Sequence, residues 1–313
     1  MKLVFAGTPA PAVPSLRSLA SSDHEIAVVI SRPDAPLGRK RVLTPSPTAA
    51  AAHELELPFI AAARLDDSVT AQVQALEPDL GVIVAYGGLV REPLLSTPRL
   101  GWINLHFSLL PRWRGAAPVQ HALIAGDELL GASVFQLVPG LDAGDVFAEV
   151  AYTVPSESTA GDALSALADI GAELLHGVVD ALAAGTISAR PQVGEPTLAP
   201  KLTLDDGRIR WAESAAAILN RFRGTTPEPG AHTSIAGARL KVLAATPAAA
   251  DAERLPSGII RAVGAEVRAG TADHPIRLLR VQPAGKPAMD AGDWWRGLRV
   301  EQLAADAAEG TLA

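Results

Sequence analysis

The stretch LGVIVAYG, residues 80–87, decides the fold class of this chain. It is a continuous apolar run that ends in a glycine-rich turn. A strand that carries no polar residue on either face requires a sheet that is covered on both sides. Such sheets are built from parallel strands, whose connections place helices on the two faces. The stretch therefore predicts one strand of a buried parallel sheet.

Other short apolar runs flank this strand and alternate with segments of helical composition. The runs are KLVFAG (2–7), IAVVIS (26–31) and GWINLH (101–106). The helical segments are one that begins at Pro14, then 47–57 and 66–79. This alternation is typical of βαβ units and predicts an open, mostly parallel, Rossmann-like α/β sheet.

The chain continues beyond this alternation with a different pattern. Residues 132–138 and 145–154 are two apolar segments too close together for a helical crossover, so they predict an antiparallel extension of the sheet. Residues 159–185 have helical spacing and a terminal glycine, which predicts a long closing helix.

The second part of the chain reads as a separate domain. Residues 186–203 contain three prolines and little periodicity, which is typical of a linker. One helix at 211–224 and several short strands follow, and these predict a smaller β-rich domain, a barrel. We therefore expect a catalytic domain at 1–189, a linker at 190–205 and a C-terminal barrel domain at 206–313.

Composition limits the classes of protein to consider. The 313 residues include no cysteine, so disulfides, thiolate metal sites and cysteine nucleophiles are excluded. The opening MKLVFAGTP has too short an apolar run for a secretory signal, and no stretch approaches the roughly 20 apolar residues of a membrane span. These features predict a cytoplasmic protein without a membrane partner.

The net charge of −7 argues against a protein that binds nucleic acid over its whole surface. Any such role must rest on a local patch, and the clearest is Arg39-Lys40-Arg41. Three adjacent basic residues can equally form a solvated loop, and composition alone leaves both interpretations open.

Ligands of open α/β sheets bind beyond the carboxyl ends of the strands. The loop AGTPAP after the first strand lacks the G-x-G-x-x-G spacing, and the chain has neither a Walker sequence nor a G-x-S-x-G elbow. What remains is Asn104 and His106, which alternate along a strand and therefore point to one face at its end. They form either a hydrogen-bonded core pair or the start of a catalytic site.

The turn GLDAGD (140–145) offers a carboxylate partner in Asp142 or Asp145. A set of Asn, His and Asp suits acyl transfer to an amine, because the amide can donate to a developing oxyanion and the imidazole can move a proton near neutral pH. The aspartate can orient the histidine and favour its charged form. The seven histidines have no close ligand spacing, so we expect no metal site.

These residues carry a family resemblance. NLHFSLLPRWRGAAPVQHALIAGD (104–127) resembles the signature of the folate-dependent formyltransferases, and GLDAGD resembles their aspartate motif. The similarity extends to MKLVFAGTP, PDAPLGRKRVLTPSP and VIVAYGGLV, and to APKLT, NRFRGTTPEPGAHT and VQPAGKPAM in the second domain. The pattern is most similar to the branch of the family that formylates methionyl initiator tRNA.

The resemblance implies an OB-like type for the C-terminal barrel, an activity and a set of site residues. The donor would be 10-formyltetrahydrofolate, and the acceptor would be the α-amino group of methionine on initiator tRNA. The matching motifs make Asn104, His106 and Asp142 catalytic. The folate-binding positions would be Ser108, Leu109, Leu110, Pro111, Ala85, Tyr86 and Gly87. The basic loop Arg39, Lys40 and Arg41 would contact the acceptor end of tRNA, and the protein would act as a monomer.

Other activities remain open on the same core. The nearest alternative is a sugar-nucleotide N-formyltransferase, which shares the Asn-x-His core but is not expected to carry the GRKRVLTPSP loop. A purine-pathway formyltransferase would lack the second domain, and a formyl-folate hydrolase would use water in place of the amine. A non-catalytic RNA-binding protein on a decayed scaffold is disfavoured by the intact Asn, His and Asp set.

Overall fold

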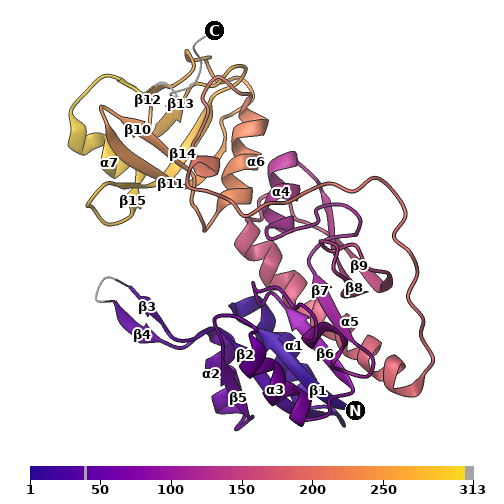
Figure 1. Ribbon diagram of the computed structural model, residues 1–313. Helices are drawn as coiled ribbons and strands as arrows, with labels where there is room; N and C mark the ends of the chain where they lie inside the picture. The colour runs from indigo at the N-terminus through magenta and orange to yellow at the C-terminus, as the bar shows by residue number, and fades with distance from the viewer. Residues whose placement is uncertain (39–40, 307–313) are drawn as a thin grey trace. The chain divides into compact units, whose positions relative to one another are not determined.

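The computed structural model describes residues 1–38 and 41–306 (Figure 1). Contacts divide the chain into two compact units. The first contains residues 1–118, 129–154 and 162–200, and the second contains residues 119–128, 155–161 and the chain from 201 onward. The domain boundaries expected at 189 and 205 stay predictions.

The first unit is built on a seven-stranded sheet with the order β5-β2-β1-β6-β7-β8-β9. The first five strands in that order pair in parallel, and β8 and β9 pair antiparallel at one edge. The strands are β1 (Lys2–Gly7), β2 (Glu25–Ser31), β5 (Phe59–Ala61), β6 (Leu80–Val84), β7 (Trp102–His106), β8 (Leu129–Gln136) and β9 (Val146–Thr153). This arrangement confirms the predicted parallel sheet and its antiparallel extension.

Helices lie on both faces of this sheet and bury its central strands on both sides. The helices are α1 (Val13–Ala20), α2 (Pro47–Glu54), α3 (Asp67–Ala75) and α5 (Ala160–Ala184), with short 3-10 turns η1 (Ala10–Ala12) and η2 (Leu94–Ser96). Asp66 caps α3 by accepting a hydrogen bond from Val69 N, as its place before the apolar spacing predicts. The helix ends before Glu77, whose φ of 48° is left-handed, and Pro78 follows. Among the described residues, no helix combines the length and apolarity that crossing a bilayer requires.

The core beneath α3 fixes the direction of β7. Trp102 is fully buried with Val69 and Val73 of α3, and its ring occupies the space beside Gly81, where a Cβ would lie 2.1 Å from the indole. Its indole N–H donates to the carbonyl of Leu94. Because side chains alternate along a strand, residues 104 and 106 point to the same face as Trp102.

A two-stranded hairpin leaves the sheet after β2. It consists of β3 (Ala35–Leu37) and β4 (Val42–Thr44), where the sequence had indicated only a loop (Figure 1). Its apolar side chains are exposed rather than buried, with Leu37 and Leu43 each 67% exposed. A strand pair that buries nothing carries no periodic signal, so the sequence did not reveal it.

The second unit is an antiparallel β structure with helices around it. Its sheet has the order β10-β11-β14-β13-β12-β16, and β15 pairs with β14. The elements are α4 (Pro118–Ala125), η3 (Asp205–Gly207), α6 (Ala215–Thr225), β10 (His232–Ile235), β11 (Ala238–Pro247), β12 (Ile259–Val263), β13 (Glu266–Ala269), β14 (Ile276–Pro283), β15 (Met289–Asp290), α7 (Ala291–Leu298) and β16 (Leu303–Ala304). The predicted β-rich second domain is confirmed.

Asp306 joins the two ends of this sheet. Its backbone N–H donates to the carbonyl of Ser234, and its carboxylate accepts from the N–H groups of Ala236 and Gly237. Ala236 and Gly237 both have positive φ, as a two-residue hairpin turn requires. Because Asp306 follows β16 and Ser234 lies in β10, these bonds close the sheet into a barrel.

Candidate active site

Asn104 and His106 stand at the carboxyl end of β7, where open α/β sheets bind their ligands. Asn104 pairs in register with Ile83 of β6 and Phe135 of β8. The Asn104 Oδ1 atom is buried and has no hydrogen-bond partner among the described residues. Buried polar atoms are rarely left unpaired, so this oxygen is available to accept a hydrogen bond from a bound molecule.

The imidazole of His106 is held between two oxygen atoms. The ring is 6% exposed, and its Nε2 lies 2.8 Å from the carbonyl oxygen of Trp113. A carbonyl can only accept, so Nε2 carries a proton. On the other side, Nδ1 lies 3.8 Å from Oδ2 of Asp142. In the neutral ring the Nδ1 lone pair therefore faces the aspartate.

Burial lowers the pKa of His106 below its ordinary value of 6.5, while the Asp142 charge and the Trp113 carbonyl raise it and offset part of the effect. The ring is therefore neutral near pH 7. This differs from the expectation that the aspartate keeps the histidine charged. A neutral imidazole with a free Nδ1 is a base, and Asp142 stabilises the cation that forms when it takes a proton.

The turn that carries Asp142 is conformationally unusual. Asp142 has a φ of 44°, in the left-handed region. Its Oδ2 accepts a 2.7 Å hydrogen bond from the backbone N–H of Gly115. Gly144 is required in this turn, because a Cβ there would lie 1.7 Å from the carbonyl oxygen of Gln136. Left-handed non-glycine residues persist where the surrounding structure enforces them, and they concentrate at functional sites.

The SLLP segment follows His106 and uses its polar groups internally. The Ser108 hydroxyl donates to the carbonyl of Arg112, and the Leu110 N–H donates to the hydroxyl of Ser133. Ser133 also contacts the carbonyl of Ser108 at 2.7 Å. The segment is therefore a tight turn fastened to β8, and its two ends are fixed beside the catalytic face of β7.

Two residues of this segment pack against other parts of the unit. The side chain of Leu109 fills the space beside Gly131, and the Pro111 ring lies against Gly194. Ser108, Leu110 and Pro111 are buried, whereas Leu109 is partly exposed.

The other predicted folate-side loop, Ala85–Tyr86–Gly87, follows β6 at the same edge of the sheet. The Tyr86 ring is buried, and its hydroxyl donates to the carbonyl of Ala62. The carbonyl groups of Tyr86 and Gly87 accept hydrogen bonds from Thr8 and Arg32. The loop therefore presents backbone at Ala85 and Gly87, which are exposed, rather than the tyrosine side chain.

Of the basic loop, the structure describes one residue. Arg39 and Lys40 lie outside the described residues. Arg41 is exposed at the tip of the β3–β4 hairpin, and its N–H donates to the carbonyl of Gly38.

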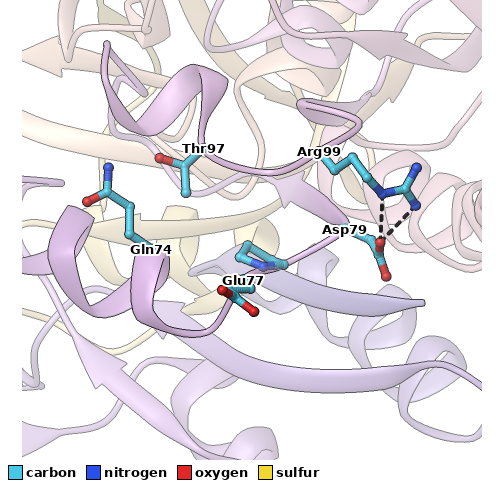
Figure 2. A pocket seen from close by; sticks show the side chains of 6 residues that line it. Gln74, Glu77, Asp79, Thr97 and Arg99 are labelled. Atoms are coloured by element: carbon cyan, nitrogen blue, oxygen red, sulfur yellow. Dashed lines mark hydrogen bonds and ion pairs between the residues drawn. The ribbon is translucent and has the colours of Figure 1, made fainter.

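A shallow hollow elsewhere on the first unit is not the active site. Figure 2 shows its lining, which includes Gln74, Glu77, Thr97 and the ion pair of Asp79 with Arg99. These residues precede β6 and β7, so the hollow lies at the amino ends of the strands, opposite the edge that carries His106. Hydrogen bonds from the Lys2 N–H and from Arg99 lower the pKa of Asp79, which fits a structural carboxylate. Residues 1–38 and 41–306 contain no cluster of three His, Cys, Asp or Glu side chains suited to a metal ion.

Sequence reasoning missed several residues that hold the site in place. Trp113 contributes a backbone carbonyl from a left-handed conformation, at a φ of 60°. The only sequence feature of Ser133 is that it carries a hydroxyl in an otherwise apolar strand. In the structure this residue is fully buried. Gln192 lies in the segment expected to be a linker, and its side chain hydrogen-bonds to the turn of Asp142. Only contacts distant in sequence reveal these roles.

His106 faces Asp142 at the carboxyl end of an α/β sheet, with Asn104 on the same strand, and comparison with known proteins identifies the class of protein. Residues 1–179 match the formyl transferase family, and residues 201–299 match the formyl transferase C-terminal domain. The chain belongs to the formyl transferase family.

Relatives within this family are similar over their whole length. The methionyl-tRNA formyltransferase of Clavibacter sepedonicus is 60% identical over 97% of this chain and 100% of its own. That of Leifsonia xyli subsp. xyli is 59% identical over 97% of this chain and 99% of its own. Among solved structures, WlaRD, a sugar 3N-formyl transferase crystallised in the presence of dTDP and 5-N-formyl-THF, has the same fold, with a TM-score of 0.66 and 15% identity. That likeness covers 92% of this chain and 99% of the other.

Proposed function

We propose that this protein transfers the formyl group of 10-formyltetrahydrofolate to the α-amino group of methionyl initiator tRNA, giving N-formylmethionyl-tRNA and tetrahydrofolate. The observation that carries the proposal is the position of His106. Its neutral imidazole lies between the Trp113 carbonyl and the Asp142 carboxylate, two residues from Asn104, whose amide oxygen is unpaired. Relatives with about 60% identity over their full length carry the corresponding name, which supports the tRNA acceptor over a sugar nucleotide.

The folate donor would bind at the carboxyl edge of the sheet. The residues suited to hold it are the fastened turn at Ser108–Pro111 and the exposed backbone of Ala85 and Gly87. The buried Asn104 Oδ1 atom, which has no partner among the described residues, can accept a hydrogen bond from a donor group of the substrate. When bound, the donor supplies an electrophilic formyl carbon, and the solved relative crystallised with 5-N-formyl-THF supports this class of donor.

The protein's own groups would act on the amine and on the formyl oxygen. The amine attacks as the free base, and the formyl oxygen gains negative charge as it does so. The Asn104 amide donates to that oxygen, a contact of the kind that contributes about 2.7–4 kcal/mol in a measured oxyanion hole. His106 accepts the proton of the attacking amine at Nδ1, and Asp142 stabilises the resulting imidazolium. When the tetrahedral adduct collapses, the bond between the formyl carbon and N10 of the donor breaks. The imidazolium returns its proton to that nitrogen, which leaves as tetrahydrofolate and restores the neutral ring.

The acceptor would be recognised through phosphates and unpaired bases rather than by overall charge. The segment Arg39-Lys40-Arg41 supplies cations, and the exposed side chains of Leu37 and Leu43 flank it in the sequence, a combination that suits the unstacked end of an RNA. We assign catalysis to the domain at 1–189 and further tRNA contacts to the barrel domain at 206–313, joined by residues 190–205. The protein would act as a monomer in the cytoplasm.

The decisive experiment offers the purified protein 10-formyltetrahydrofolate with either methionyl initiator tRNA or an amino-sugar nucleotide. We expect formyl transfer to the tRNA and none to the sugar. Formylation of the sugar alone would overturn the proposal. Release of formate without either acceptor would instead indicate a hydrolase.

A further inference from the structure

The segment between the two domains is fastened along the active site rather than free. Arg190 exchanges two backbone hydrogen bonds with Val146 of β9, at 2.8 and 2.9 Å. Further along, Arg114 exchanges backbone hydrogen bonds with Thr197 and Ala199, at 2.8 and 2.7 Å. We call residues 190–199 the strap. It runs between the start of β9 and the loop that carries Trp113, the two backbone segments that orient His106 and Asp142.

One side chain of the strap faces the catalytic turn. The Gln192 Nε2 group donates to the carbonyl oxygens of Asp142 and Gly144, each at 2.8 Å. Its Oε1 accepts from Nε and Nη2 of Arg114, at 3.2 and 2.7 Å. The opposite amide orientation would set Oε1 against two carbonyls and the NH2 group against a guanidinium, so these partners fix the orientation. The Gln192 amide therefore makes four hydrogen bonds that only an amide of this length can make together.

We propose that Gln192 is a positioning residue for catalysis: it clamps the Asp142 turn to Arg114 and so keeps the Asp142 carboxylate opposite Nδ1 of His106. The turn needs such a clamp because Asp142 occupies a left-handed conformation that its own sequence does not favour. The two carbonyl groups that Gln192 binds belong to Asp142 and Gly144. The clamp therefore fixes the backbone on both sides of Ala143, the residue that follows Asp142. On the opposite side the carboxylate is fixed by the Gly115 N–H.

The charges around His106 make this role measurable. Asp142 is the ionised group that acts on the ring, while the Trp113 carbonyl bonds its other nitrogen. Two other charged groups lie nearby, and each has a hydrogen-bond partner. Glu149 of β9 accepts a hydrogen bond from Ser133 of β8, and the Arg114 guanidinium donates to Gln192. Release of the clamp moves the Asp142 charge away from Nδ1, so the pKa of His106 falls.

The expected change in kcat rests on the proposed function, whereas the expected change in the His106 pKa does not. We would compare Gln192→Ala with Gln192→Met, which keeps the length and the neutral charge but makes none of the four hydrogen bonds, and with Glu195→Gln, an exposed substitution in the same strap. NMR titration of His106 in the free protein needs no substrate. Its result is therefore independent of which acceptor the enzyme uses.

We expect kcat to fall about 10- to 100-fold in both Gln192 variants, the scale of a misplaced catalytic group, with KM changed less than twofold. The His106 pKa should fall in both variants and stay unchanged in Glu195→Gln. A double variant, Gln192→Ala with Arg114→Ala, should lose no more kcat than the more damaged of the two single variants. A wild-type His106 titration in folded Gln192→Ala and Gln192→Met would overturn the inference, whatever their turnover. If Gln192→Ala fails to fold, the Gln192→Met titration alone decides.

Discussion

Nδ1 of His106 lies 3.8 Å from Oδ2 of Asp142, too far for a hydrogen bond and close enough for an ion pair. The same carboxylate oxygen is hydrogen-bonded to the N–H of Gly115 at 2.7 Å, which prevents it from moving closer without losing that bond. The neutral imidazole therefore keeps a free lone pair at Nδ1. The attraction to Asp142 develops only when the ring gains a proton, which is when a base catalyst benefits from it.

Asp142→Asn removes this charge and is expected to shift the pH dependence of the reaction. Asp142 raises the pKa of His106, so its loss lowers that pKa. If the neutral ring is the active form, kcat/KM rises with pH as His106 loses its proton, and the rise moves to lower pH in the variant. The plateau should fall about 100-fold or more, as for a general base whose cation is no longer stabilised.

Asp145→Asn provides the matched control for this change. Asp145 belongs to the same turn, but its side chain is exposed. We expect a wild-type pH profile from it. A shift of equal size in both variants would mean that the net charge of the turn, and not the Asp142 contact, sets the pKa of His106.

Ser133→Ala should loosen the SLLP turn. The Ser133 hydroxyl is fully buried and accepts from the Leu110 N–H at 3.2 Å. Leaving that N–H unpaired costs about 1–3 kcal/mol of unfolding free energy, measurable by denaturant titration. If the turn holds the folate donor, KM for the donor rises as well. The exposed substitution Ser68→Ala should change neither quantity.

Arg41→Gln tests the basic hairpin. Arg41 is exposed at the hairpin tip, so the substitution leaves folding unaffected. A lost charge-assisted contact to a phosphate should lower kcat/KM for the tRNA about tenfold at low salt. It should also reduce the salt dependence of log kcat/KM by about 0.7 for each contact to single-stranded RNA. Arg64→Gln, another exposed site, is the control, and identical salt slopes in both variants would contradict a role for Arg41.

Gly81→Ala tests the packing that directs β7. A Cβ at residue 81 would lie 2.1 Å from the Trp102 ring, so the indole must shift and its bond to Leu94 must stretch. We expect a loss of about 1–3 kcal/mol in the unfolding free energy. Gly177→Ala, in helix α5 where a Cβ meets nothing within 4 Å, should be neutral or stabilising. Equal destabilisation by both would show that the Trp102 contact is not the cause.

The sheet was predictable because its signal is local. Uninterrupted apolar strands such as Leu80–Val84, separated by capped helices such as that begun by Asp66, permit little other than a parallel sheet. The three-residue strands β3, β4 and β5 were not predicted, since so few residues give no periodicity. Pro78 and the left-handed Glu77 end α3 earlier than its composition suggests.

The site was predictable only in part. The alternation of Asn104 and His106 along one strand, together with the glycine-flanked Asp142, identified the candidate groups. Their environment was not predictable, because the neutral state of His106 depends on burial and on a backbone carbonyl whose position a sequence does not encode locally. Gln192 was hidden for the same reason, since its partners lie in the turn of Asp142 and at Arg114.

The central claim is that His106 moves the proton in formyl transfer to methionyl initiator tRNA. The most direct measurement is single-turnover formylation of that tRNA by His106→Ala, with folate-donor binding and thermal unfolding measured in parallel. We expect the rate to fall about 100- to 10,000-fold while donor binding and folding stay close to wild type. A single-turnover rate within a few-fold of wild type in the folded variant would contradict the mechanism.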